Sequence, residues 1–206
     1  MKLLIKICLP IFILFGFLTL AQADSDPVPL AQLKSLATQM TGELDKHQNN
    51  LKNNDKLVND IVVRILLPHF DLVGVSRSVV NRDAWQSADP NLQKEFTQEF
   101  TNYIIRTYSS ALASYEGEKI KFYPLRSFDP SQPTVQIYSD IIQKDAPPIP
   151  VSYRLKNQNN DWIIYDFSVE GISLVQNYRS QFASALQKGG LTELVKELKT
   201  HNQSLK

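Results

Sequence analysis

The sequence predicts an α+β protein in which helices precede and follow a four-stranded antiparallel sheet. For about ninety residues after residue 29, apolar side chains recur at spacings of three and four, which is typical of amphipathic helices. From Gly117 the spacing changes to two, and four strand-like segments follow. The connecting segments, DPSQP, KDAPP and NQNN, are too short for parallel crossovers. The sheet is therefore expected to be antiparallel.

Four helices are predicted before the sheet. The stripe of the first helix is Leu30, Leu33, Leu36, Met40 and Leu44. Asp55 can cap the second helix, which Pro68 ends, and the segment DLVGVSRSVV, residues 71–80, forms the third. The fourth, residues 91–115, follows an N-cap aspartate and a first-turn proline, Asp89-Pro90. It carries the strongest apolar stripe of the sequence.

The predicted strands cover residues 118–125, 134–143, 149–156 and 161–169. The third alternates cleanly between apolar and polar residues, whereas the fourth, WIIYDFSV, is apolar on both faces. A strand of that kind is either sandwiched between layers or has one face against an apolar cavity. Two helices, residues 172–188 and 191–201, are expected to close the chain.

The first 23 residues have the three-part layout of a secretory signal peptide. Lys2 and Lys6 precede an apolar run from Ile7 to Leu20, and Ala21-Gln22-Ala23 forms the cleavage site. We expect cleavage there, which leaves residues 24–206 as a single domain without the only cysteine, Cys8. Cleavage also removes two of the 22 basic residues and none of the 21 acidic ones, so the net charge falls to about −1. That balance speaks against nucleic acid as a partner, because phosphate binding requires clustered Lys and Arg.

No catalytic constellation stands out in the sequence. His69 lies at a helix break, with no second histidine or carboxylate at metal-ligand spacing, so a structural role is favoured over catalysis. Asp166 and Glu170 could act as general acid and base from one face of the fourth strand. The structural alternatives are favoured: Asp166 pairs with Arg154 across the sheet, and Glu170 stabilises a helix start.

The predicted helix 91–115 places two Phe and three Tyr on one face. Such side chains most often form plain core. Their number, and a fourth strand that is apolar on both sides, also permit an apolar ligand pocket with tyrosine hydroxyls at its wet rim. Both interpretations remain open at this point.

Two segments resemble the signature regions of the MlaC or toluene-tolerance family of periplasmic phospholipid-binding proteins. They are LLPHFDLVGVSRSVVNRDAWQSADPNLQKEFTQEF, residues 66–100, and WIIYDFSVEGISLVQNYRSQF, residues 162–182. The signal peptide, the chain length and the order of helices and sheet also agree. The resemblance covers essentially all of residues 24–206.

The resemblance implies a nuclear-transport-factor-2-like cone, enlarged by extra helices, with a hydrophobic cavity for phospholipid acyl chains. It implies a monomeric carrier in the periplasm that is not an enzyme and needs no cofactor, its phospholipid being cargo. The partners implied are an outer-membrane lipoprotein and porin complex and an inner-membrane ABC transporter with MCE domains. Such a shuttle would maintain the lipid asymmetry of the outer membrane.

We expect the cavity to be lined from several elements, with Ile104 of the fourth helix on one wall. Tyr165 and Phe167 are expected to share one face of the fourth strand and to form the opposite wall. The full set of expected lipid-binding residues is Ile61, Ile65, Phe70, Phe96, Phe100, Ile104, Tyr108, Val151, Tyr153, Tyr165, Phe167, Val175 and Tyr178. Gly171 is expected to relieve the backbone between strand and helix. Two alternatives remain: a small periplasmic enzyme with His69 or Asp166 as base, and a protein-interaction module whose aromatic side chains form core or a docking surface.

Overall fold

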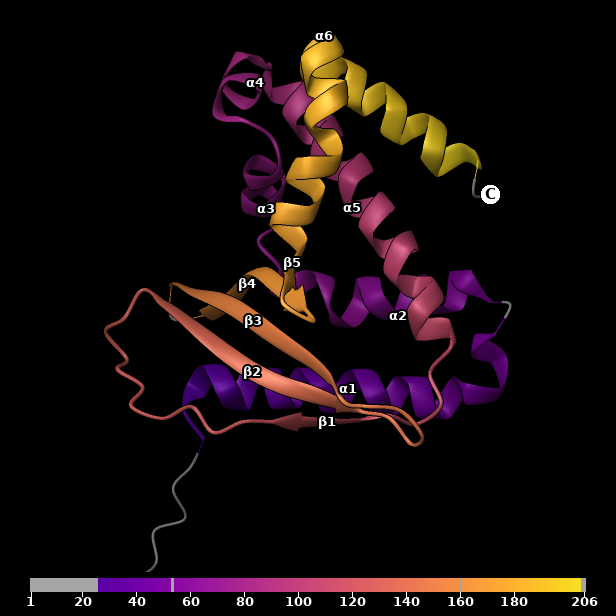
Figure 1. Cartoon of the computed structure of the whole chain (residues 1–206), viewed down its shortest axis with the longest axis vertical. Helices are drawn as coiled ribbons and strands as arrows, with labels where there is room; N and C mark the ends of the chain where they lie inside the picture. Colours follow the sequence, from indigo (N-terminus) through magenta and orange to yellow (C-terminus); the bar gives the residue numbers. More distant parts are fainter. Residues whose placement is uncertain (1–25, 53, 160, 205–206) are drawn as a thin grey trace, which may run out of the picture.

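The computed structural model of the chain describes residues 26–52, 54–159 and 161–204. Over these residues helices come first, an antiparallel sheet follows, and a long helix ends the chain (Figure 1). The α+β class and the antiparallel sheet expected from the sequence are confirmed. The expected signal peptide, residues 1–23, lies outside the described residues.

The helices before the sheet follow the predicted pattern, with two differences. The elements are α1 (Val28–Leu51), α2 (Asp55–Ile65), the 3₁₀ turn η1 (Leu67–His69), α3 (Leu72–Val79), α4 (Arg82–Ser87) and α5 (Pro90–Ala113). The N-cap of α2 is Asn54, whose Oδ1 accepts from the Leu57 amide at 3.1 Å, so the prediction of Asp55 as the cap is wrong. The short helix α4, capped by Asn81, was not predicted.

The sheet has five strands, one more than predicted, in the order β1-β2-β3-β4-β5. They are β1 (Lys119–Phe122), β2 (Thr134–Ile142), β3 (Ile149–Gln158), β4 (Asp161–Val169) and β5 (Ile172–Ser173). β1 is shorter than the predicted strand 118–125 and ends two residues before Pro124, which has no N–H to donate to a ladder. β5 escaped prediction because two residues are too few to show an alternation.

A tight turn, not a helix start, follows β4. Glu170 and Gly171 both have positive φ, 52° and 80°, as a two-residue hairpin turn requires. The turn brings β5 back beside β4, and α6 (Leu174–Ser204) begins only after it. The expectation that Glu170 stabilises a helix start is therefore wrong. Gly189 and Gly190 interrupt α6 between the two helices predicted at 172–188 and 191–201.

A bulge changes which way β4 presents its side chains. Arg154 pairs with Asp166 and Leu155 with Ile164, so Tyr165 has no partner on β3. The Tyr165 ring lies 5.6 Å from the Arg154 guanidinium, whereas Phe167 lies opposite Tyr153, the residue before Arg154. Because a bulge inserts one extra residue, alternation restarts beyond it. The prediction that Tyr165 and Phe167 share one face is therefore wrong.

The core consists of two hydrophobic clusters. The lower cluster, in the view of Figure 1, joins the sheet to α1 and α2, and includes Leu44, Ile61 and Leu155. The upper cluster joins α3, α5 and α6, and includes Phe96 and Phe100. α5 runs from one region to the other and contributes buried residues to both (Figure 1). Within the described part of the chain, no helix combines the length and apolar character needed to cross a bilayer.

Candidate functional site

The site is built around the stripe of α5 that passes from the upper cluster to the lower one. Ile104 and Tyr108 pack against the upper cluster, and Leu112, one turn further, packs against the lower cluster. Residues four apart on a helix lie on one face, so these three side chains form a continuous line. All three are only partly buried. The line therefore keeps some of its apolar surface accessible where the two clusters meet.

Aromatic side chains of the sheet and of the segment after η1 meet this line. The ring of Phe167 lies 5.5 Å from that of Tyr108 and 6.3 Å from that of Phe70, both in edge-to-face geometry. Tyr153 lies opposite Phe167 on β3. We call this set the apolar seam: Phe70, Ile104, Tyr108, Leu112, Tyr153 and Phe167. It joins residues of four parts of the chain, the segment after η1, α5, β3 and β4, between the two clusters.

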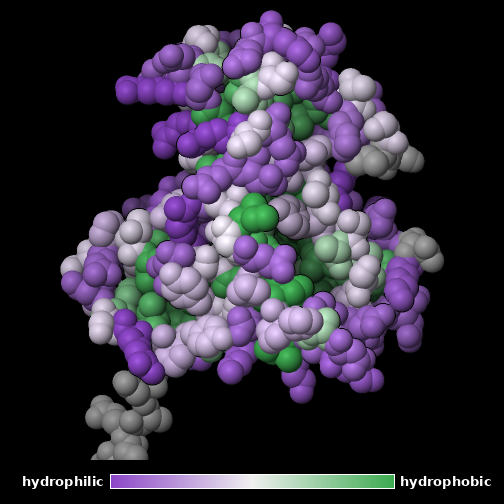
Figure 2. Space-filling model, in the orientation of Figure 1, coloured by the Kyte–Doolittle hydropathy of each residue, from purple (hydrophilic) through white to green (hydrophobic). Residues whose placement is uncertain are grey.

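Figure 2 shows hydrophobic residues at the base of a hollow between the upper helices and the sheet, enclosed by a mainly hydrophilic surface. An exposed apolar side chain, Ile172 of β5, is 65% accessible. A concave apolar surface within a polar one is the usual form of a site for an apolar ligand.

The hydroxyl groups of the seam remain neutral at physiological pH. Burial raises the pKa of Tyr108, and the negative charge of Asp166 raises it further. Burial also raises the pKa of Tyr153, against the opposite effect of a hydrogen bond with Ser139, whose Oγ lies 3.2 Å from the phenol oxygen. The six residues of the seam thus offer apolar surface and two uncharged phenols. This surface suits hydrocarbon with a few polar atoms at its edge.

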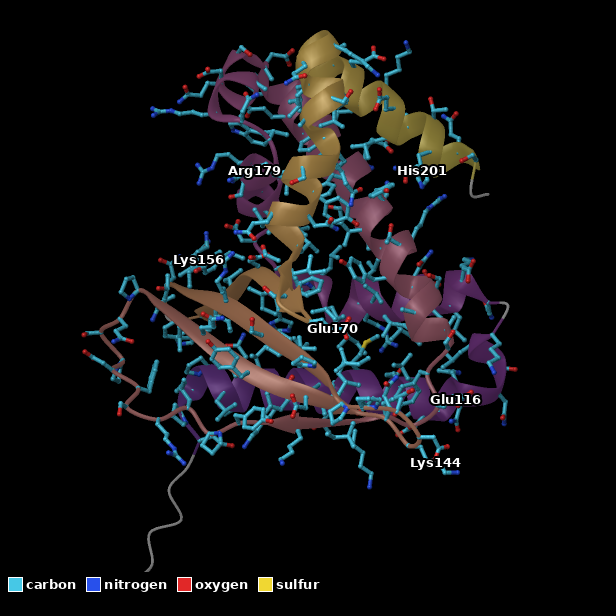
Figure 3. The ribbon with its side chains drawn as sticks, viewed as in Figure 1. Glu116, Lys144, Lys156, Glu170, Arg179 and His201 are labelled. Carbon is cyan, nitrogen blue, oxygen red and sulfur yellow. The ribbon has the colours of Figure 1, made fainter. Side chains whose placement is uncertain are left out.

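Asp166 lies at a junction of the sheet and α6. Its fully buried carboxylate accepts from the Arg154 guanidinium, from Ser173 Oγ at 2.6 Å and from the Val175 amide at 3.1 Å. Ser173 Oγ in turn accepts from the Gln176 amide at 3.2 Å. The predicted pair of Asp166 and Arg154 is therefore confirmed, and the same carboxylate also fixes the start of α6. Glu170 is exposed at the end of the hairpin and takes no part in this network (Figure 3).

A second ion pair fixes the start of α3. Lys156 Nζ of β3 lies 2.5 Å from an oxygen of Asp71, and the other oxygen of Asp71 accepts from the Gly74 amide at 3.0 Å. Asp71 is thus both the N-cap of α3 and a link to the sheet. The two carboxylates, Asp71 and Asp166, attach both upper helices to the strands that carry the seam.

Several of the predicted site residues are fully buried core. Phe96, Phe100 and Tyr178 pack with Phe182 in an aromatic cluster whose ring centroids lie 5.1 to 6.2 Å apart. Val175 belongs to the same upper cluster. Ile61 and Ile65 of α2 belong to the lower cluster. These side chains belong to the two core clusters against which the seam residues pack.

The remaining predicted residues divide between the seam and its surroundings. Phe70, Ile104, Tyr108, Tyr153 and Phe167 form the seam itself. Val151 is buried opposite Val169, and Tyr165 lies at the bulge beside Arg154. The seam residue that the sequence analysis did not single out is Leu112. Its position four residues after Tyr108 was the available signal.

His69 lies away from the Asp166 network. Its Nδ1 is 3.5 Å from the side-chain nitrogen of Gln32, which donates to the Trp162 carbonyl at 2.9 Å. This neighbourhood joins α1, η1 and β4. Among residues 26–204, apart from residues 53 and 160, no group of three His, Cys, Asp or Glu side chains could hold a metal ion.

Comparison with known proteins gives the family. The model of the family described as MlaC protein matches residues 34–200, which is most of the chain. The chain belongs to the MlaC family. The resemblance seen in the two signature segments is thereby confirmed.

Curated relatives of this MlaC-family chain span nearly its whole length. Toluene tolerance protein Ttg2D of Pseudomonas putida is 27% identical over 178 residues, which cover 86% of this chain and 81% of the relative. The intermembrane phospholipid transport system binding protein MlaC of Haemophilus influenzae is 22% identical over 190 residues, which cover 91% of this chain and 88% of the relative.

A solved structure of the same fold holds a ligand. It is the phospholipid-binding protein of Ralstonia solanacearum in complex with a phospholipid. It superposes on this MlaC-family chain with a TM-score of 0.78 at 26% identity, and the match covers 85% of this chain and 97% of the other. The fold predicted from the sequence is therefore the fold of a phospholipid-binding protein.

Proposed function

We propose that this protein is a phospholipid carrier of the bacterial periplasm and that acyl chains bind along the apolar seam. The observation that carries the proposal is the Ralstonia structure, which holds a phospholipid in the same fold over almost its entire length. The seam supplies the chemistry that such a ligand needs: partly accessible apolar side chains and two neutral phenols. The buried residues Phe96, Phe100 and Tyr178 would form the supporting wall.

The energetics suit a carrier. Shielding a sixteen-carbon chain from water is worth on the order of 12 kcal/mol, at about 0.8 kcal/mol for each methylene. A membrane offers the chain nearly the same shelter. In a carrier pocket of similar apolarity the chain therefore has nearly the same free energy as in the membrane. A docking partner can then decide the direction of lipid transfer.

We further propose that the carrier moves between an outer-membrane lipoprotein and porin complex and an inner-membrane ABC transporter with MCE domains. The name of the Haemophilus relative, an intermembrane phospholipid transport system binding protein, supports this role. The sequence pattern of a cleaved signal peptide at residues 1–23 supports a periplasmic location. In this proposal phospholipid is cargo, and the protein works without a cofactor.

The structure offers little to the alternative of an enzyme with Asp166 as base. In the described part of the chain its carboxylate accepts from three donors, the Arg154 guanidinium, the Ser173 hydroxyl and the Val175 amide, which give it a clear structural role. The His69 ring lies beside the Gln32 side chain, with Nδ1 3.5 Å from the Gln32 nitrogen. We therefore propose a binding protein without catalytic turnover.

Native mass spectrometry of protein purified without detergent tests the proposal. A carrier expressed in the periplasm of a double-membraned bacterium should arrive with phospholipid bound, as a mass increment of one or more diacyl lipids. Lipid extraction and fragmentation then identify the cargo. A spectrum with the unliganded mass alone, from protein shown to be folded by circular dichroism, would contradict lipid carriage.

A further inference from the structure

A second apolar surface lies on the opposite side of α5 from the aromatic cluster. It is a groove of about 540 Å³ between α5 on one side and α2, η1 and α3 on the other, with Trp85 of α4 and Pro90 at one end. Its lining residues are Val63, Leu67, Leu72, Val73, Trp85, Pro90, Gln93, Lys94, Thr97, Gln98, Thr101, Asn102 and Ile105. Of the seam and predicted site residues, none belongs to this lining.

The apolar side chains of the groove come mainly from α2, η1 and α3. Leu67 and Leu72 are half-buried, and Ile105 of α5 is buried. Val63 and Val73 remain 45% and 59% accessible. Two of the large exposed apolar side chains of the described chain thus border a single groove. Isolated exposed valines need no explanation, but a pair bordering a continuous apolar surface indicates a binding surface.

The wall formed by α5 is polar and has unused hydrogen-bonding capacity. Gln93 and Thr97 are engaged with backbone carbonyls of the same region. Gln98, Thr101 and Asn102 have no side-chain partner among the described residues. The polar wall can therefore bond to a partner without breaking contacts of its own.

The charge of the groove has one sign. Lys94 is its only charged lining residue, and no carboxylate lies within ion-pair distance of Lys94 in the described part of the chain. Its neighbour in sequence, Glu95, is paired with Lys199 instead. A partner segment that places a carboxylate near Lys94 would meet an uncompensated cation.

We propose that this groove receives one amphipathic helix of a partner protein, with aliphatic side chains on its inner face and a carboxylate near Lys94. The lining stretch of α5 from Gln93 to Ile105 is about 18 Å long, at 1.5 Å per residue. That length matches about three turns of a docked helix, whose anchors would recur at i, i+3 or i+4, and i+7. Apolar residues from one side, free amides from the other and a lone cation together fit such a helix.

The groove is well placed to act on cargo. Ile105 lines the groove and packs in the lower cluster, while its neighbour Ile104 belongs to the apolar seam. A docked helix would therefore contact the same turn of α5 that borders the seam. The inference that this partner is a membrane complex that exchanges lipid rests on the proposed function.

Fluorescence anisotropy with labelled fourteen-residue helical peptides tests the groove directly. The first set of peptides carries a leucine face and a single Glu, placed at each position flanking that face in turn. The second set carries Lys at the same positions. The third is a scrambled sequence of equal composition. We expect the best Glu peptide to bind two- to fivefold more tightly than its Lys counterpart, and Lys94→Glu to reverse that preference. Val73→Asp should weaken the Glu peptide about tenfold or more, whereas Tyr138→Asp, at an exposed site on β2, should leave it unchanged.

Three results would overturn the docking proposal. They are equal binding of the scrambled peptide, an unchanged preference in Lys94→Glu, and undiminished binding by Val73→Asp. Cosedimentation with phosphatidylglycerol vesicles forms a separate arm: if Val73→Asp abolishes vesicle binding while no peptide binds, the surface serves membranes and not a helix. Native mass spectrometry of Val73→Asp loaded with phospholipid from detergent keeps the two proposals apart, because this loading bypasses docking and should match that of the wild-type protein.

Discussion

At the residue scale, Asp166 shows how one buried carboxylate can organise a site without taking part in it. It joins Arg154 of β3, Ser173 of β5 and the first turn of α6. A buried charge is costly unless it is paired and hydrogen-bonded, and here each partner lies on a different element. The position of α6 relative to the sheet therefore depends on this side chain.

We expect Asp166→Asn to lower the free energy of unfolding by about 1.5–3 kcal/mol, because the charge-assisted bond to Arg154 is lost. The matched control is Glu170→Gln, the same chemical change at an exposed position, which should stay within about 0.5 kcal/mol of wild type. Urea unfolding followed by circular dichroism measures both. Equal stability of the two variants would show that the network adds nothing to stability.

At the element scale, α5 separates two surfaces. One face holds the aromatic cluster and the seam, and another forms the polar wall of the groove. β4 is similarly divided by its bulge, which places Tyr165 beside Arg154 and Phe167 against Tyr108. The seam exists because α5 and β4 each present the correct face at the point where they meet.

Ile104→Asp should sharply reduce the phospholipid that co-purifies with the protein. An unpaired charge against acyl chains costs several kcal/mol. Ser110→Asp introduces the same charge at an exposed position of α5 and should retain lipid. Phosphorus analysis of the two purified variants, after their folding has been checked by circular dichroism, gives the comparison. Undiminished lipid in folded Ile104→Asp would place the acyl chains outside the seam.

At the scale of the whole molecule, the core is divided into two clusters. The sheet packs with α1 and α2 in the lower cluster, and α3 and α6 pack together in the upper cluster. The seam lies between the two clusters. The formal charge of the full sequence is only +1, so long-range electrostatic steering toward either membrane is weak. Encounter with a partner therefore has to be followed by specific contacts.

We expect lipid transfer to or from vesicles to be fast only when the vesicles carry the partner membrane complexes. A chain that leaves the pocket alone must cross water at a cost approaching its full burial energy, whereas a docked complex can provide an apolar path. Transfer of a fluorescent phospholipid to bare and to protein-bearing vesicles measures the difference. Equally rapid transfer with bare vesicles would show that the protein exchanges lipid unaided.

The sequence by itself determined the order of elements and the membership of the family. Apolar spacing located α1, α2, α3 and α5 and four of the strands, because both helical and strand periods are local properties. It also identified the pair of Arg154 and Asp166, since antiparallel register follows from short turns. Five of the six seam residues, all except Leu112, were among the expected site residues.

Tertiary structure alone decided which of those residues meet. The bulge at Tyr165 and the two-residue strand β5 leave no clear periodic trace, yet they determine where Phe167 lies and where α6 begins. Phe100 and Tyr108 share one helical stripe, but the first is enclosed by α6 and the second lies at the seam. The groove beside Lys94 depends on how α2 and α3 pack against α5. Spacing along a chain gives the direction of a side chain, whereas its neighbours depend on contacts between residues far apart in the sequence.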